Sequence, residues 1–444
     1  MLRFPRAALT LVCALALLPG PFCLAAPVAA SQAQPATVLD WSQALALWQA
    51  QSRALRLARL QVDAAEGDRL AADVAPNPQL SLNLGQMAPG YVGGGGFRDK
   101  HIDKVLRVDQ LIERGGKREL RTQVADAQLN ASRLDLQDTE RTQRVALAQA
   151  YYGLLQAQER RHLLEETAQL YDTALQAMNL RLKAGDVAPV EVARLRVEAA
   201  RAVNDARQAQ TDHVAARQAL ALLLNLGAMA ANTLEVTPSW PAVDDKAGHP
   251  GTVSAELREA VGKRADVQAA RSRLQAAEHA LDLARSLRTR DVTVGMQVEQ
   301  CLASSCGIPA RSYGVGVSVP LFIGNTYDGE IRRAEAELDM ARALTEQAEA
   351  QALADLEQAQ SALLNSQARR QLMENRDTGE GPAGILADAR RAATGAELAY
   401  TKGAASLLEV LDARRTLRAV QLEAVQVRYE YAVAAIAWQA ALGN

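Results

Sequence analysis

Two acidic side chains near the carboxyl end of the chain, Glu409 and Asp412, are spaced so that they could act on the same cation. Residues three apart lie next to each other on one face of a helix, so the two carboxylates could attract a cation together. The alternative is an ordinary solvated helix face on which Arg414 or Arg415 neutralises them. Spacing alone favours this alternative.

A second candidate is a cysteine pair, Cys301 and Cys306, with four residues between them. In an exported protein this pair predicts a disulfide in a hairpin loop, with two free thiols as the alternative. A metal site there would lack a nearby histidine. The five histidines of the chain form no ligand cluster, and no His-Glu-x-x-His, Cys-x-x-Cys or nucleophile-elbow pattern occurs. We therefore expect no resident metal, no cofactor and no enzymatic activity.

The amino terminus predicts export. Arg3 and Arg6 precede an apolar run that is followed by small residues, so we expect a signal peptide over residues 1–26, with cleavage as late as residue 30. Cys23 could carry a lipid, but the residues before it match a lipoprotein processing site poorly. No later segment reaches the run of about 18 apolar residues that a membrane-spanning helix needs.

Composition and charge favour long helices over a nucleic-acid binder. The formal net charge is −2, and no Lys/Arg block occurs, so the sequence lacks the basic footprint that nucleic acid requires. Aromatic residues make up only 4% of the chain, while Ala, Leu, Gln and Arg fill the long segments. That composition suits helices packed closely through small side chains. The expected fold class is mainly α with a small β part.

One pattern, a glycine followed six residues later by Glu-Val, occurs twice at a constant offset of 218 residues, as from 185 to 403. Long helical sequence flanks each copy, so each predicts a tight turn at the tip of a helical hairpin, where glycine takes a positive φ without strain. The matching pairs are Gly185 and Gly403, Glu191 and Glu409, and Val192 and Val410.

This tandem repeat divides the mature chain into two helix–strand–strand–helix halves. The expected segments are a first half at 40–226, an irregular equatorial connector at 227–253, and a second half at 254–444 with an equatorial interruption at 376–385. Alternation of apolar and polar residues predicts strands at about 79–85, 102–112, 291–299 and 312–322. Uninterrupted helical patterns predict single helices over 41–75 and 256–290 and a long helix over 117–183.

The four strands indicate a membrane location and an oligomer. Strands of about ten residues can cross an outer membrane, with the apolar face toward lipid. Four strands cannot close a barrel, and an open edge in lipid leaves backbone groups unpaired at several kcal/mol each. Three copies give the simplest closed barrel with room for a channel. The alternative is a soluble pair of β-hairpins capping a coiled coil.

The signal peptide, the twofold repeat and the glycine and Glu-Val tips resemble the TolC family of outer-membrane efflux ducts, over essentially the whole mature chain. Residues 400–443, which include Tyr400, Gly403, Glu409 and Asp412, carry the most specific signature. The stretch Gln-Leu-Ile-Glu-Arg-Gly-Gly-Lys-Arg at 110–118 is similar to the start of the long helix in CzcC-type members, which serve heavy-metal resistance–nodulation–division exporters.

The resemblance implies a homotrimeric duct, with four transmembrane β-strands per chain in one barrel and a periplasmic tunnel of helices. It implies outer-membrane lipid, a periplasmic adaptor and an inner-membrane resistance–nodulation–division pump as partners. It further implies an acidic aperture, a latch and adaptor contacts at the hairpin tips. The implied residues are Glu409 and Asp412 for the aperture, Tyr400 and Glu191 for the latch, and Gly185, Gly403, Val192 and Val410 for the adaptor contacts. Ala405 stands where the family commonly has an arginine, which departs from the family's full closing network.

The expected function is therefore passive export of divalent heavy-metal cations through the outer membrane. A duct for drugs or secreted polypeptides, a periplasmic adaptor and a coiled-coil structural protein are the alternatives. Adaptors carry one helical hairpin between other modules, so two hairpins with strands at the opposite end fit them badly.

Overall fold

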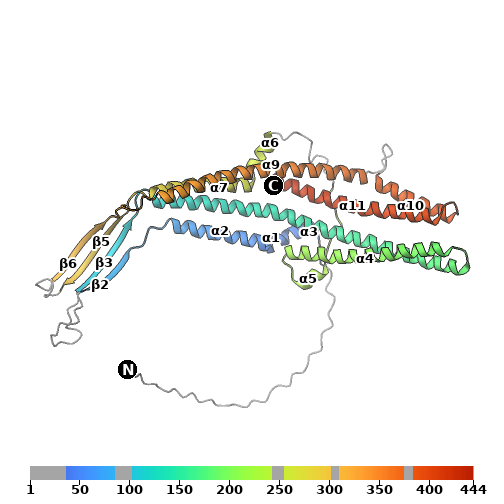
Figure 1. Ribbon diagram of the computed structural model, residues 1–444. Helices are drawn as coiled ribbons and strands as arrows, with labels where there is room; N and C mark the ends of the chain where they lie inside the picture. Colours follow the sequence, from blue (N-terminus) through green and yellow to red (C-terminus); the bar gives the residue numbers. More distant parts are fainter. Residues whose placement is uncertain (1–36, 86–102, 243–254, 302–309, 375–383, 444) are drawn as a thin grey trace, which may run out of the picture. The chain divides into compact units, whose positions relative to one another are not determined.

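The computed structural model describes residues 37–85, 103–242, 255–301, 310–374 and 384–443 (Figure 1). These residues belong to one compact unit, Thr37–Asn444. The expected signal peptide and Cys23 lie outside the described residues.

Helices dominate both halves, and the mainly α class expected from composition is confirmed. The first half contains α1 (Trp41–Gln51), α2 (Arg53–Ala72), α3 (Lys117–Ala184), α4 (Pro189–Leu223) and α5 (Ala228–Thr233). The second half contains α6 (Ala255–Lys263), α7 (Ala265–Ser286), α9 (Asp328–Glu374), α10 (Ile385–Thr401) and α11 (Leu407–Ala441).

No helix among the described residues combines the length and apolar character needed to cross a membrane.

Four strands form one antiparallel sheet in the order β2-β3-β5-β6. Their bounds are Gln79–Gly85 for β2, Asp103–Ile112 for β3, Val292–Cys301 for β5 and Ala310–Ser318 for β6. One row of paired residues across the sheet is apolar and exposed, namely Leu80, Val108, Met296 and Val315. The neighbouring row is Ser81, Arg107, Gln297 and Gly314. Because side chains alternate along a strand, one face of the sheet is apolar and the other polar.

The last strand differs from its expected range of 312–322, because β6 ends at Ser318. Pro320 follows two residues later and has no amide hydrogen to donate to a ladder. Leu321 and Ile323 continue the apolar pattern outside the strand and are exposed.

The two single helices expected at 41–75 and 256–290 are each broken, so those expectations are wrong. Ser52 separates α1 from α2 and caps α2, since its Oγ accepts a hydrogen bond from the Leu55 amide at 3.4 Å. Arg264 separates α6 from α7 in an extended conformation, with φ −61° and ψ 142°. Its fully buried side chain explains the second break.

Arg264 is the centre of a buried charge network that joins three helices. Its guanidinium donates to Asp266 at 2.6 Å, to Asp355 of α9 at 3.2 Å and to the Ala352 carbonyl at 3.1 Å. Arg141 of α3 reaches the same Asp266 at 3.5 Å. Burial opposes ionisation of Asp266, but the hydrogen bond and charge of Arg264, with the charge of Arg141, lower its pKa.

The connector expected to be irregular contains two regular elements, so that expectation is wrong in part. Besides α5 it carries β4 (Leu234–Val236), which pairs in parallel with β1 (Thr37–Leu39). Beyond β4, the Trp240 indole donates to Glu159 of α3 at 2.6 Å, and Arg370 of α9 donates to the Pro241 carbonyl at 2.8 Å. The connector thus ties α3 to α9. Most of the interruption expected at 376–385 lies outside the described residues.

The helices follow the same lateral order as the strands. Next to the sheet, α2 packs on α3, α3 on α7, and α7 on α9 (Figure 1). Toward the hairpin tips, α4 packs on α3, α3 on α11, and α11 on α10. The first and second halves therefore meet at β3·β5, α3·α7 and α3·α11. In the sheet and in both rows of helices, one outer element belongs to the first half and the other to the second half.

The stretch at 110–118 forms the junction between the sheet and α3. Lys117 is buried, and its Nζ donates to the Thr289 carbonyl at 2.9 Å and to Asp291 Oδ2 at 2.8 Å, so it joins the first half to the second. Gly115 and Gly116 both have positive φ, at 75° and 70°. A Cβ at Gly115 would lie 2.8 Å from Thr289 Cβ, whereas a Cβ at Gly116 would meet nothing within 4 Å.

This difference predicts unequal costs for two neighbouring substitutions. Gly116→Ala should cost about 1 kcal/mol, because alanine is strained at positive φ but would meet open space. Gly115→Ala should cost about 1–3 kcal/mol more, because the methyl would displace Thr289. Thermal unfolding followed by circular dichroism in detergent measures both, and equal costs would contradict the close packing at Gly115.

His213 of α4 predicts an acid-sensitive packing of α4 on α3. It is fully buried, and burial followed by the charges of Arg217 and Arg161 lowers its pKa to about 4. Between pH 4 and the ordinary value of 6.5 the unfolded chain binds a proton that the folded chain does not. Stability should therefore fall as pH falls through this window, by at most about 3 kcal/mol.

The variant His213→Leu should flatten this dependence, because it removes the titrating group while keeping an apolar side chain. His162→Gln, at an exposed position of α3, is the matched control and should retain the slope. The measurement is the midpoint of thermal unfolding of the wild type and both variants between pH 4 and 7. Parallel plots of midpoint against pH for the three proteins would contradict the prediction.

Candidate functional site

The two hairpin tips have the same backbone geometry. Gly185 ends α3 with φ 82°, and Gly403 follows α10 with φ 74°. In both, the glycine amide bonds a carbonyl three residues back and the next amide bonds one five residues back, as in a Schellman motif. The bonds run from Gly185 to Leu182 (3.1 Å), Asp186 to Arg181 (2.9 Å), Gly403 to Tyr400 (2.9 Å) and Ala404 to Ala399 (2.8 Å).

The paired acids, Glu191 and Glu409, occupy the first turn of the helices that follow the tips. Ser406 caps α11 by accepting a hydrogen bond from the Glu409 amide at 3.3 Å. A carboxylate in a first turn is stabilised by the partial positive charge of the helix N-terminus. Glu409 therefore also stabilises the N-terminus of α11. The Ser-Leu-Leu-Glu sequence at 406–409 matches the pattern of a capping box and could have indicated this cap.

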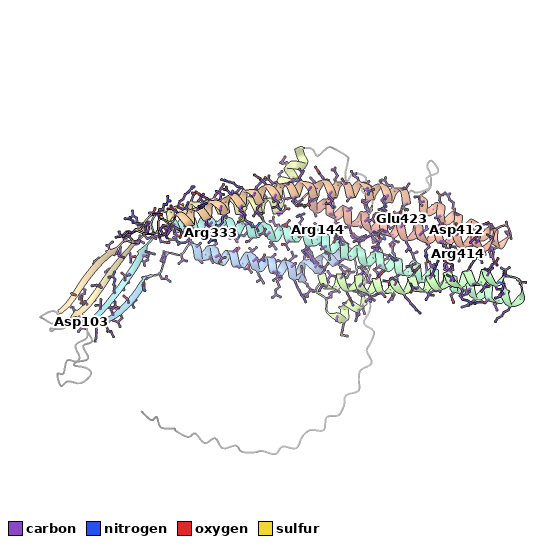
Figure 2. The ribbon with its side chains drawn as sticks, in the orientation of Figure 1. Asp103, Arg144, Arg333, Asp412, Arg414 and Glu423 are labelled. Carbon is purple, nitrogen blue, oxygen red and sulfur yellow. The ribbon has the colours of Figure 1, made fainter. Side chains whose placement is uncertain are left out.

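Glu409 and Asp412 are both exposed and lie three residues apart in α11. Asp412 lies near the tip end of that helix (Figure 2). The neighbouring arginines bond elsewhere: Arg414 to Glu397 of α10 at 2.8 Å, and Arg415 to Glu198 of α4 at 2.5 Å. Within the described part of the chain, no ion pair joins either arginine to Glu409 or Asp412. The hydrogen bond of Glu198 raises the pKa of Arg415 and the charge of Asp412 adds to this effect, but neither carboxylate is bonded to these arginines. The acidic aperture stays a prediction.

The two hairpin tips are joined through Tyr400, but not through Glu191. Arg181 Nη1 donates to the Tyr400 hydroxyl at 3.2 Å, and no hydrogen bond between Tyr400 and Glu191 occurs among the described residues. Arg181 lies four residues before Gly185, a position that the sequence comparison of the two tips did not single out. The latch of Tyr400 on Glu191 stays a prediction for another state.

The adaptor contacts expected at Val192 and Val410 require a correction. Their exposed fractions are 1% and 7%, and Val192 packs with Tyr171 and Leu195 in a core between α3 and α4. Buried side chains cannot form a docking surface, and Val192 instead helps to hold α3 and α4 together. The exposed apolar side chains at the tips are Leu180, Val190, Leu398 and Leu408. The tip glycines are exposed as well.

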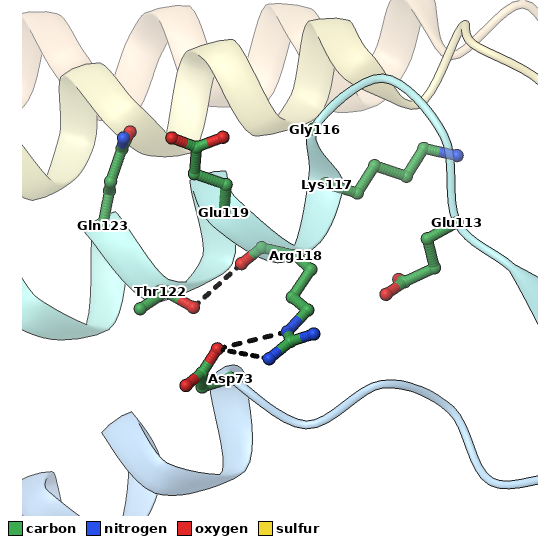
Figure 3. A pocket seen from close by; sticks show the side chains of 8 residues that line it. All are labelled: Asp73, Glu113, Gly116, Lys117, Arg118, Glu119, Thr122 and Gln123. Carbon is green, nitrogen blue, oxygen red and sulfur yellow. Dashed lines mark hydrogen bonds and ion pairs between the residues drawn. The ribbon is translucent and has the colours of Figure 1, made fainter.

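A shallow cleft lies at the junction of α2 and α3, at the other end of α3 (Figure 3). Arg118 donates to Asp73 at 2.9 and 3.1 Å, and the Thr122 hydroxyl donates to the Arg118 carbonyl at 2.9 Å. Glu113 also lines the cleft and pairs with Arg121. These charges are satisfied by each other, so the cleft is a structural joint.

Nothing among the described residues gathers three or more potential metal ligands of the His, Cys, Asp and Glu types. The disulfide expected between Cys301 and Cys306 cannot be placed, because Cys306 lies outside the described residues. It stays a prediction.

Comparison with known proteins places this geometry in a family. The sequence profile described as "Outer membrane efflux protein" matches residues 44–226 and 257–444, most of both halves. The cobalt-zinc-cadmium resistance protein CzcC of Cupriavidus metallidurans is 26% identical over 367 residues, covering 82% of this chain and 80% of CzcC. The outer membrane efflux protein BepC of Brucella suis is 27% identical over 347 residues, covering 76% of this chain and 71% of BepC.

A solved structure has the same fold. The outer membrane protein VceC of Vibrio cholerae superposes with a TM-score of 0.72 at 20% identity, covering 91% of this chain and 96% of VceC. The profile match over both halves, supported by these similarities, shows that the chain belongs to the outer membrane efflux protein family, a family of outer-membrane channels of tripartite export systems.

Proposed function

We propose that three copies of this chain form one closed duct that carries divalent heavy-metal cations passively out of the cell. A periplasmic adaptor binds the hairpin tips, and an inner-membrane resistance–nodulation–division pump delivers the cations. The chain itself catalyses nothing; it supplies the walls of the path.

The open four-stranded sheet is the observation that carries this proposal. Its apolar face is exposed on every strand, and among the described strands β2 and β6 each pair on one side only. In lipid the apolar face is stabilised, but the free edges are not. Pairing β6 of one copy with β2 of the next satisfies both edges, and three copies complete a barrel of twelve strands.

The helices supply the reach across the periplasm. The 68 residues of α3 span about 100 Å at about 1.5 Å per residue. They separate the sheet from the tip at Gly185, so a sheet in the outer membrane leaves the tips deep in the periplasm. The exposed apolar residues beside the tip glycines, such as Val190 and Leu408, are suited to contact with an adaptor.

The metal assignment rests on two features. The relative CzcC is a cobalt-zinc-cadmium resistance protein. Glu409 and Asp412 are exposed and form no ion pair with the arginines beside them among the described residues, so three copies would present six carboxylates around a narrow opening. Such a ring attracts cations and disfavours anions.

Removing the acidic ring should change conduction. In planar bilayers, Glu409→Ala/Asp412→Ala should raise the single-channel conductance and abolish block by multivalent cations, because the opening loses charge and bulk. Glu259→Ala, an exposed acid on α6, is the matched control and should behave as wild type. Unchanged conductance and unchanged block in the double variant would refute the aperture.

The substrate is tested in the cell. Deleting the gene should sensitise the cells to cobalt, zinc and cadmium, and the wild-type gene should restore resistance. The double variant should show whether the ring affects metal tolerance as well as conduction. Sensitivity to drugs with unchanged metal tolerance would favour the alternative, a duct for drugs, and would leave the channel proposal standing.

A further inference from the structure

The helices beside the sheet end in two exposed edges whose chemistry is complementary. In the order α2, α3, α7, α9, the outer members α2 and α9 face away from each other. α2 exposes Leu57 and Leu60, and α9 exposes Met340 and Leu344. Exposed leucine and methionine at helical spacing indicate a surface that another helix covers.

Two oppositely charged side chains stand among these apolar residues. Arg59 on α2 and Glu346 on α9 are exposed, and neither has a hydrogen bond or ion pair with any other described residue. Neighbouring charges on the same helices are paired within the chain: Arg69 with Asp126 at 3.0 Å and Arg271 with Glu349 at 2.6 Å. Arg59 and Glu346 thus have no partner among the described residues, and the same holds for some other charges of α2 and α9, such as Asp63.

The internal repeat indicates how the two edges fit together. A shift of 214 residues carries the end of α2, Ala72, onto the end of α7, Ser286. A shift of 211 residues carries the start of α3, Lys117, onto the start of α9, Asp328. The α2·α3 pair therefore corresponds to α7·α9. An α9·α2 contact between copies corresponds in turn to the α3·α7 contact within the chain.

The same shifts agree with observed contacts. The pair Arg285–Glu335 joins α7 to α9, and subtracting the two shifts from its residue numbers gives residues 71 and 124. In antiparallel helices, a step forward on one helix is a step back on the other. Residues 71 and 124 are therefore in the same register as the pair Arg69–Asp126 between α2 and α3. Two contacts in different halves thus share one register.

Applied to the α3·α7 contact, the shifts identify a pair of residues. Asp135 of α3 and Arg273 of α7 form an ion pair within the chain. Asp135 maps onto Glu346, and Arg273 maps onto Arg59, so an acid and an arginine recur at the corresponding positions. One turn along the antiparallel helices, Asp63 and Arg342 come opposite each other in the same register, again with opposite charges.

We propose that α2 of one copy docks antiparallel on α9 of a second copy in the register of the α3·α7 contact, with Arg59 bonded to Glu346. This inference rests on the proposed closed duct and adds its lateral interface. The occupant of both edges is a second copy of this chain.

Charge reversal tests the pair in the full-length protein. Arg59→Glu and Glu346→Arg should each raise the dissociation constant between copies about fivefold or more, since each places like charges together. The double variant Arg59→Glu/Glu346→Arg should recover wild-type assembly. Lys263→Glu, an exposed charge of α6 outside both edges, should have no effect. Native mass measurements in detergent report assembly, and circular dichroism reports that each variant is folded.

Cross-linking tests the register directly. A chain with Arg59→Cys and Glu346→Cys, treated with a short thiol cross-linker, should give covalent dimers and trimers on a denaturing gel. A chain with Arg59→Cys and Arg333→Cys should not, because Arg333 is exposed on α9 but more than about three turns away. The wild-type chain, treated identically, controls for its natural cysteines.

The outcomes separate this inference from the proposed function. A wild-type protein that stays monomeric would refute the closed duct itself. Oligomers that resist both charge reversals, with no cross-link between positions 59 and 346, would overturn the interface and leave the duct intact. Free thiol labelling of both positions within the oligomer would mean that these edges stay uncovered, and it would likewise overturn the interface.

Discussion

The backbone edges of β2 and β6 impose the constraint on which the rest of the structure depends. Within the described sheet each of these strands is paired on one side, and its apolar face is exposed. Water can satisfy a free edge, but hydrocarbon cannot. The helices repeat this arrangement, since α2, α4, α9 and α10 occupy the same two outer edges. In the closed duct that we propose, this chain is one segment of a ring, and whole copies are joined in the manner of its two halves.

Buried cations hold the segment together where the helical or strand pattern breaks. Lys117 bonds Asp291 at the point where the sheet gives way to α3. Arg264 bonds Asp266 and Asp355 where α6 gives way to α7. A buried cation is tolerated only when acids and carbonyls surround it, so Lys117 bonds the Thr289 carbonyl and Asp291, and Arg264 bonds acids of α7 and α9 and the Ala352 carbonyl. These pairs set the direction in which the next element leaves.

The hairpin tips show how a repeated backbone can carry different chemistry. The same turn geometry recurs at Gly185 and Gly403, yet Asp186 follows one glycine and Ala404 the other. The acids Glu191 and Glu409 both begin a helix, but only Glu409 has a second acid one turn later, at Asp412. The common geometry therefore preserves the hairpin, while the differences place the second acid of each tip at a different position: beside the glycine at Asp186, and one turn into the helix at Asp412.

The sequence by itself determined the order of helical and strand segments and the two tips, because periodicity and glycine at positive φ are local properties. It also indicated the family and the acidic pair at Glu409 and Asp412. Only the tertiary structure decided that Val192 is buried and that Arg414 and Arg415 bond Glu397 and Glu198. Burial and ion pairing depend on which distant segments become neighbours, and no local pattern specifies that. The same reason explains the helix break at Arg264, whose acid on α9 lies 91 residues away in the chain.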